Sequence, residues 1–226
     1  MPDVTLVCTD CMEEIHIKNS IRAFDRCLQL CDFGAVKFLT DKDIDYPHKV
    51  ATMPLPSLVH YSIFCLKELP KYIDTKYALI VQNDGWILNA DAWDNKFYEY
   101  DYIGPLFNQY DIQGVGGFSF RSKALMNKVS AMWPAWDVNN TDAFQRRVGC
   151  YEDGAIAMLL RPDLERQGFK FATLEDAGRF AQGGNPNNQF WVERPFGFHG
   201  SWRAIDQTTG KVSSQIKHDG FVPQPI

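Results

Sequence analysis

The polar run Gln82-Asn83-Asp84 directly follows an apolar stretch, YALIV, that is typical of a buried strand. A carboxylate in such a place is costly to bury unless a partner compensates its charge. Residues two apart on a strand project to the same side, so Gln82 and Asp84 are expected to face one way, and Asn83 to face the other or to bend with the turn at Gly85. Mg²⁺ and Mn²⁺ take oxygen ligands and bridge carboxylates to phosphates. The run therefore indicates a metal ion or a ligand at this strand end, although the amide of Gln82 replaces the first acid of a two-carboxylate motif.

Glu152 and Asp153 open the stretch YEDGAIAMLLR, whose apolar spacing predicts a helix. Two acids at a helix N-terminus are stabilised by the helix dipole, which is a purely structural explanation. The functional explanation is a general base, because inverting sugar transfer needs a carboxylate to take the proton of the acceptor hydroxyl. No second protein acid is needed when the leaving group is a metal-bound diphosphate.

Two glycines and one histidine add to these candidates. Gly116 and Gly117 begin the run GGFSFRS, which lacks the lysine of a phosphate-binding P-loop. They would let the backbone approach a sugar closely, or simply form a bulge or turn. His199 lies in FGFHG, where its imidazole could complete a Mn²⁺ coordination sphere or serve only the structure. Trp202 could form a wall for a sugar ring or pack in the core.

Three apolar runs predict the elements that position these residues. They read as short buried strands: VTLVCTD at 4–10, AVKFLTD at 35–41 and YALIVQND at 77–84. Helical spacing of apolar residues predicts a helix between each pair of strands, the first capped by Asn19 and the second ended near Pro70. Strand, helix, strand, helix, strand gives a parallel sheet with right-handed crossovers. The expected fold class is therefore α/β.

Each predicted strand ends in an acid: Asp10, Asp41 and Asp84. Parallel strands bring these ends to one edge of the sheet, where open α/β folds bind their ligands. An acid after a strand is also a common turn or helix-cap residue. Three acids in equivalent positions favour a shared crevice.

The second half of the chain is less regular. It predicts a short strand and turn at 99–107, a strand within 114–122 and a helix at 123–132. The final residues are polar and contain prolines. A first half suited to a nucleotide and a second half with scattered polar motifs indicate a nucleotide-linked donor and a separate acceptor.

The composition excludes several classes of protein. The chain has 226 residues, 45% of them apolar, and a net charge of −5. We expect one soluble domain, no nucleic-acid partner and no membrane span. No signal peptide is visible, so a cytoplasmic location is expected. Cys8 and Cys11 have CxxC spacing, yet no second pair accompanies them, which favours buried free thiols over a metal site or disulfide.

Taken in order, the motifs YALIVQNDGWIL, YDYIG, VGGFSFRS, ED and FGFHG resemble a largely uncharacterised family of bacteria and large viruses that is assigned to GT-A-type glycosyltransferases. The resemblance runs from about Thr5 to Trp202. It implies one GT-A domain at 1–226, in which a Rossmann-like half with a mixed central sheet binds the nucleotide sugar. This half would cover about 1–105, the acceptor half about 106–205, and a tail 206–226.

The resemblance also implies roles for the candidate residues. Asp153 would be the inverting base, accompanied by Glu152, and Asp84 and His199 would hold Mn²⁺ or Mg²⁺. The remaining positions would contact the two substrates: the donor through Thr9, Asp10, Asp41, Gln82, Asn83, Asp84, Gly116 and Gly117, and the acceptor through Ser119 and Trp202.

These features lead to the expectation of an inverting, metal-assisted glycosyltransferase. It would move a sugar from a nucleotide-diphosphate sugar, with UDP favoured, to a hydroxyl of a glycan or another acceptor. The alternatives are a non-catalytic nucleotide-sugar or carbohydrate-binding module on the same fold and a retaining transferase. A metal-dependent phosphohydrolase fits less well, because only one acid remains at the strand end.

Overall fold

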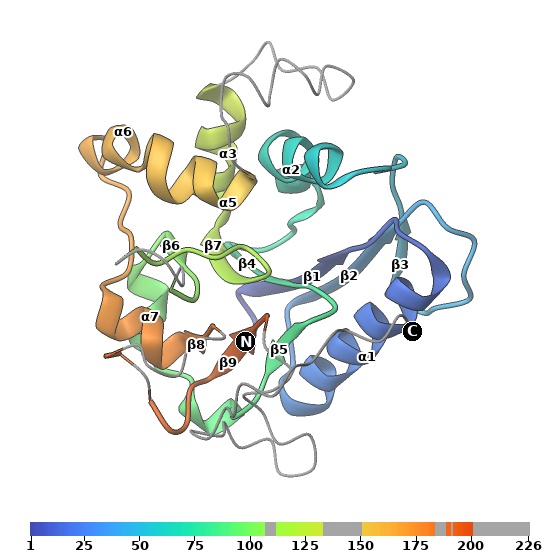
Figure 1. Ribbon diagram of the computed structural model, residues 1–226, viewed down its shortest axis with the longest axis horizontal. Coiled ribbons are helices and arrows are strands. Elements are labelled where there is room, and N and C mark those ends of the chain that lie inside the picture. The colour runs from blue at the N-terminus through green and yellow to red at the C-terminus, as the bar shows by residue number, and fades with distance from the viewer. Residues whose placement is uncertain (107–111, 133–150, 184–188, 191, 201–226) are drawn as a thin grey trace, which may run out of the picture.

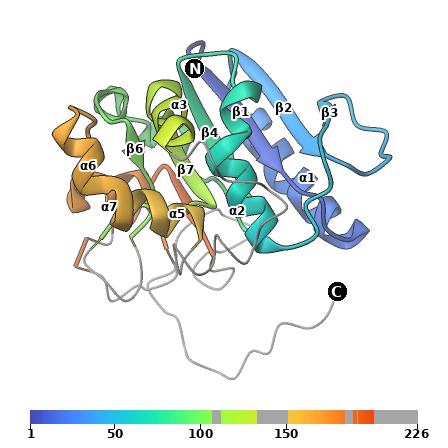
Figure 2. The same ribbon diagram turned by 90° about the horizontal axis from the view of Figure 1, so that it is seen from above.

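The computed structural model describes residues 1–106, 112–132, 151–183, 189–190 and 192–200. Its centre is a six-stranded sheet of order β3-β2-β1-β4-β7-β6, in which the first four strands are parallel and the last two run in alternating directions (Figures 1 and 2). The strands are β1 (Val4–Thr9), β2 (Ala35–Thr40), β3 (Lys49–Ala51), β4 (Tyr77–Val81), β6 (Tyr102–Ile103) and β7 (Phe118–Ser122).

The three strands predicted in the first half are confirmed as β1, β2 and β4, and they pair in parallel as expected. Each ends before its polar tail. After β4, the N–H of Gly85 bonds to the carbonyl of Gln82 at 3.2 Å, which turns the chain out of the sheet. The polar residues therefore occupy turns at the sheet edge, where their side chains are free to converge.

The predicted crossover helices are also present, with one error at a boundary. The first is α1 (Glu14–Leu30), and it begins after Glu13, so the prediction of Asn19 as its cap is wrong. The helix starts earlier because Ile17 already belongs to the buried apolar face. The second is α2 (Leu58–Lys67), followed by a 3₁₀ turn that contains Pro70.

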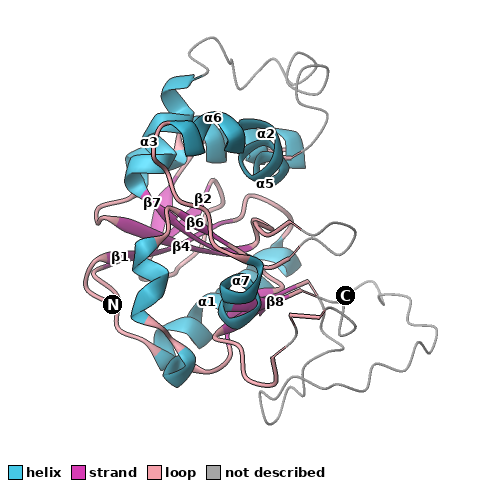
Figure 3. Cartoon of the chain, turned by 90° about the vertical axis from the view of Figure 1, so that its left-hand side faces the viewer, coloured by secondary structure: helices cyan, strands magenta, loops and turns pink. Residues whose placement is uncertain are grey.

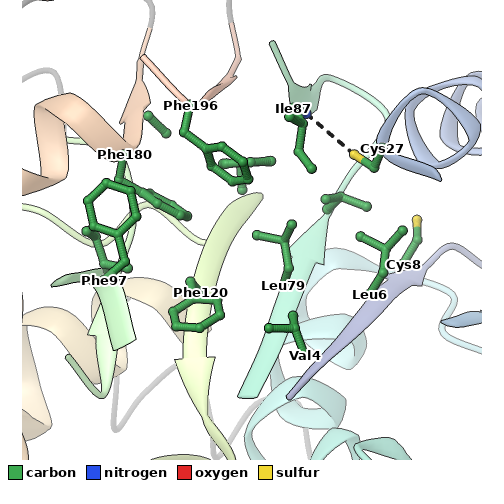
Figure 4. Close-up of a cluster of buried hydrophobic side chains, with 14 of the residues drawn as sticks. Val4, Leu6, Cys8, Cys27, Leu79, Ile87, Phe97, Phe120, Phe180 and Phe196 are labelled. Carbon is green, nitrogen blue, oxygen red and sulfur yellow. Dashed lines mark hydrogen bonds between the residues drawn. The ribbon is translucent and has the colours of Figure 1, made fainter. Parts of the chain in front are cut away.

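The helices cover the two faces of the central sheet (Figure 3). On one face α1, α7 (Leu174–Phe180) and a small second sheet enclose the largest apolar core. This core is rich in phenylalanine and aliphatic side chains (Figure 4). On the other face lie α2, α3 (Lys123–Met132) and α6 (Arg161–Arg166). Alternate residues of β1 face the two cores, as a strand buried on both sides requires.

The second half contains elements that were predicted and others that were not. The strand β7 and the helix α3 match the predicted strand and the predicted range 123–132. The predicted helix after position 151 is present as α5 (Glu152–Gly154), a π-helical segment (Ala155–Leu160) and then α6. The sequence did not reveal the second sheet, of order β5-β9-β8. Its strands are β5 (Gly85–Ile87), β8 (Ala181–Gln182) and β9 (Gly197–His199).

Two further expectations concern the described part of the chain. Five cysteines there are free thiols, among them Cys8 and Cys11 of the CxxC pair, and both of these are buried. In the same part of the chain no helix is long and apolar enough to cross a membrane. The structure is thus a mixed α/β protein built on a mixed sheet, which agrees with the coarse fold class and is compatible with a Rossmann-like arrangement.

Candidate functional site

The site begins where β4 ends, because Gln82 and Asp84 both turn toward His199. The Nε2 atom of His199 lies 3.2 Å from Oδ1 of Asp84 and 3.4 Å from Oε1 of Gln82. Asn83 points elsewhere and donates to His16 at 3.1 Å. Asn83 thus faces away from its two neighbours as expected, but all three residues lie in the turn after β4, so the bend at Gly85 produces this arrangement and not a continuing strand. Burial works to raise the pKa of Asp84, but the hydrogen bond and charge of His199 outweigh it and lower that pKa.

His199 reaches this place through β9, which pairs antiparallel with β5 in the register Gly85 to His199 (Figure 1). The next residue, Gly200, donates its N–H to the carbonyl of Asp84 at 2.9 Å. Gly200 has φ of 82°, a left-handed conformation that glycine adopts without strain. A strand from the far end of the described chain is therefore pinned to the strand-end turn.

Gly117 leaves the space that the imidazole fills. A Cβ atom built on it would lie 1.9 Å from Nε2 of His199 and 2.5 Å from Oε1 of Gln82. Built on the preceding Gly116, a Cβ atom would lie 2.5 Å from Oε1 of Glu152 and 3.0 Å from the Cβ of Asp153. Adjacent Cα atoms are about 3.8 Å apart. The Gly-Gly turn therefore has His199 and Gln82 against one glycine and the two acids against the next, one peptide unit away.

Asp153 is held by two backbone N–H groups. Its Oδ2 accepts from Gly116 at 3.0 Å and its Oδ1 accepts from Gly154 at 2.7 Å. The side chain is partly exposed. Each oxygen keeps a second lone pair for another donor, so the carboxylate is oriented and still able to accept a proton. A π-helical segment begins two residues later, a feature that is frequent at functional sites.

Glu152 points the other way, into the protein, and is only 3% exposed. Its carboxylate accepts from Ser62 of α2 at 3.3 Å and lies 3.5 Å from Nη2 of Arg121. Arg121 is 1% exposed and also donates to the hydroxyl of Ser119 at 3.0 Å. The sequence grouped Glu152 with Asp153, but burial separates the two acids and leaves Asp153 as the one that can meet a substrate.

Ser119 belongs to the same buried network. It has no exposed surface, and its hydroxyl donates to the carbonyl of Gly116 at 2.9 Å while accepting from Arg121. The hydroxyl therefore fixes the Gly-Gly turn, and the contact with an acceptor expected from the sequence does not fit this position. Arg121 in turn stacks over the ring of Tyr102, with 4.9 Å between Cζ and the ring centroid.

Burial and, next, the charge of Asp153 raise the pKa of Glu152 from 4.5 to about 7, although Arg121 acts to lower it. The folded protein therefore keeps a proton on Glu152 that the unfolded chain releases between these values. We expect the free energy of unfolding to fall as the pH rises from 4.5 to 7, by on the order of 1–3 kcal/mol. Urea denaturation at pH 5, 6, 7 and 8 measures this slope. In Glu152→Gln, which imitates the protonated acid, the slope should be smaller; an unchanged slope would assign it to other groups.

A pocket of about 260 Å³, called the strand-end pocket below, opens beside this site between the ends of β1 and β4. Thr9, Asp10, Gln82 and Asn83 line it, together with His16 and residues of the α2 region. The carboxylate of Asp10 accepts from the N–H of Met12 at 2.9 Å and from Ser20 at 2.5 Å, so it also shapes the turn after β1. A second hollow, of about 660 Å³, shares Cys11 and Met12 with the pocket.

Asp41 lies at the end of the neighbouring strand, β2. Its Oδ2 is 3.2 Å from Nζ of Lys42, a residue that lines the second hollow. Its Oδ1 is buried and has no hydrogen-bond partner within the part of the chain that the structure describes. A buried carboxylate oxygen without a donor is costly. Asp41 is not among the described residues that line either hollow, so its expected contact with the donor stays a prediction.

The structure thus brings Gln82, Asp84, His199, Gly116, Gly117 and Asp153 into one site, with the strand-end pocket beside it. Trp202 and the tail lie outside the described residues. Sequence reasoning missed four contributors: His16, Tyr61, Ser62 and Arg121. His16, Ser62 and Arg121 could have been found because each is a polar residue between apolar neighbours in a strand or helix, as with Arg121 in FSFRS.

The residues around His199 also fit a divalent cation. Tyr61 accepts from Nε2 of Gln82 at 2.9 Å, which leaves Oε1 of Gln82 directed at His199. Neighbouring ligands of an octahedral cation are about 3 Å apart, close to the spacing of these donor atoms. Among the described residues no three His, Cys, Asp or Glu side chains form such a group, so a cation held here would need the amide oxygen of Gln82 as its third protein donor.

Fold and site together define a mixed α/β protein with a polar site at the carboxyl edge of its sheet. The sequence profile of a family described as "Protein of unknown function (DUF5672)" matches residues 49–199, and the chain belongs to this family. The matched range starts at β3 and ends at His199, so it contains the strand-end turn, the Gly-Gly turn and both acids. No curated protein matches the chain.

Proposed function

We propose that this protein is an inverting glycosyltransferase of GT-A type that transfers a sugar from a nucleotide-diphosphate sugar to a hydroxyl group. One observation carries the proposal. The Gly116-Gly117 turn lies between an oriented carboxylate, that of Asp153, and the cluster of Gln82, Asp84 and His199, which is the proposed binding site of the donor diphosphate. In such a transfer, the base that deprotonates the acceptor and the group that binds the donor diphosphate must lie on either side of one sugar ring. The two sides of the Gly116-Gly117 turn are suited to these two roles.

The donor would lie across the strand ends. The strand-end pocket and the second hollow next to it offer room for the nucleoside. A UDP-sugar is the favoured donor, with GDP- and CDP-sugars as the alternatives to be tested. The diphosphate would then reach Asp84 and His199.

In the reaction, Asp153 takes the proton of the acceptor hydroxyl as that oxygen bonds to the anomeric carbon. The bond from that carbon to the diphosphate breaks on the opposite face, and the configuration inverts. A bound Mn²⁺ or Mg²⁺ would neutralise the charge of the leaving diphosphate. Gly117 leaves room for the imidazole of His199, and Arg121 and Ser119 hold the turn in place.

A thermal-shift panel tests the proposal with UDP, GDP and CDP, each with and without Mn²⁺. At about 100-fold above Kd a ligand stabilises by about 2.7 kcal/mol, a rise of several degrees in Tm for a chain of this size. We expect UDP with Mn²⁺ to give the largest rise. Asp84→Asn should remove the effect of Mn²⁺, whereas Asp91→Asn, at an exposed acid paired with Arg194, should keep it.

Turnover is measured next, with the matching nucleotide sugars and a panel of acceptors. Release of free nucleotide or transfer of sugar supports the enzyme. Tight binding without turnover over long incubation would favour the non-catalytic binding module, and no response to any nucleotide would contradict the proposal.

A further inference from the structure

A diphosphate at the strand ends would lie near two carboxylates, those of Asp10 and Asp84, and needs positive charge or N–H donors nearby. No lysine or arginine is found among the residues that line the strand-end pocket in the described part of the chain. Among the described residues, His16 is the one basic side chain that lines it. The nearest lysine of the second hollow, Lys42, is already paired with Asp41.

His16 sits on the first turn of α1, directly above the turn that ends β4. Its Nδ1 accepts a hydrogen bond from Nδ2 of Asn83 at 3.1 Å and lies 4.0 Å from Oδ2 of Asp10. A neutral imidazole that accepts at Nδ1 carries its hydrogen on Nε2. That atom has no hydrogen-bond partner among the described residues, and the side chain is 49% exposed.

The strand-end turn therefore stands between two imidazoles. Gln82 and Asp84 face His199 on one side, and Asn83 faces His16 on the other. A ligand that lies across this turn, from the strand-end pocket to Asp84, would pass the Nε2–H of His16 on its way.

We infer that His16 is a phosphate-recognition residue, whose Nε2–H donates a hydrogen bond to a phosphate oxygen of a nucleoside diphosphate. The inference rests on the proposed function and adds to it a protein contact for the diphosphate that does not depend on a metal. Asn83 acts as the positioning residue that fixes the imidazole.

A purely structural role fits His16 poorly. The side chain is half exposed and belongs to none of the apolar cores, and it does not cap α1, whose N-cap position is Glu13. The acid nearest on the helix, Glu14, is exposed and pairs with Lys18 at 2.7 Å. Substitution of His16 should therefore leave the fold intact.

The test is isothermal titration of wild-type protein and His16→Ala with UDP, GDP and CDP and with the corresponding nucleosides, without added metal. A hydrogen bond to a charged group predicts that His16→Ala binds the preferred diphosphate about tenfold more weakly. Affinity for the nucleoside alone should stay within about twofold, because the lost contact is to phosphate. Lys18→Ala is the matched control, since it removes a full charge from the same helix outside the pocket.

Each other outcome overturns the inference in a recognisable way. Unchanged diphosphate affinity in His16→Ala would exclude the contact and leave the proposed function standing. An equal loss for the nucleoside would place His16 at the nucleoside, and an equal loss in Lys18→Ala would reduce the effect to general electrostatics. If wild-type protein binds no diphosphate with or without Mn²⁺, both the inference and the proposed function fail.

Discussion

Replacing Asp153 by asparagine is expected to slow sugar transfer about 10²–10⁴-fold, the range that a general base contributes. Asparagine can still accept the N–H of Gly116, so the turn should keep its shape. It cannot take a proton from the acceptor. Donor affinity should therefore stay within about twofold of wild type, because the base contacts the acceptor and not the donor. Initial rates and donor titrations on the same preparation measure both quantities.

Glu152→Gln is the control for this prediction. Glu152 is buried against Arg121 and Ser62, so its neutral analogue should slow transfer far less than Asp153→Asn does. Equal losses in the two variants would mean that the acids act together and that burial is a poor guide to their roles. A comparable loss of donor binding in Asp153→Asn would exclude it as the base.

The second large effect concerns stability. Arg121→Met is expected to lower the free energy of unfolding by about 3–5 kcal/mol, the usual result of removing one partner of a buried ion pair. Methionine fills a similar volume, but Glu152 then lacks its counter-ion and Ser119 lacks its donor. The loss should be larger at pH 8 than at pH 6, because a raised pKa lets Glu152 become neutral at lower pH. Urea denaturation at the two pH values measures it.

Arg161→Met provides a matched control, since Arg161 also pairs with a glutamate and lies over an aromatic ring but is partly exposed. Its replacement should cost less than about 1 kcal/mol. The double variant Arg121→Met/Glu152→Gln should recover part of the lost stability at pH 8 by removing the buried charge. A single-variant loss no greater than that of Arg161→Met would contradict the assignment of a buried ion pair.

The sequence predicted the parts of this fold that depend on local patterns. The strands β1, β2 and β4 are apolar runs bounded by polar residues, and α3 begins and ends at the predicted residues. The sheet β5-β9-β8 could not be predicted, because its strands have two or three residues and their pairing is not local. A pattern of period two needs more residues than that to be recognised.

The candidate site divides in the same way. The opposite orientation of Asn83 relative to its two neighbours was predicted, although the turn at Gly85 produces it and not strand geometry. The separation of Glu152 from Asp153 was not, because it depends on Arg121, which lies on β7, 31 residues earlier in the chain. The contact of Ser119 with Arg121 joins residues two apart on β7, so strand geometry could have predicted it, whereas the burial of the pair could not be read from the sequence.

The long reach of His199 has a consequence for the order in which the protein is made. His199 and Gln82 are 117 residues apart in the chain, and β9 must pair with β5 before they meet. During synthesis the carboxylate of Asp84 therefore leaves the ribosome long before its imidazole partner exists. A nascent chain can fold much of the central sheet early, yet it gains this binding site only after β9 has been synthesised. A ligand that bridges the two residues would therefore stabilise the chain only after β9 has paired with β5, and not the folding intermediates that precede this step.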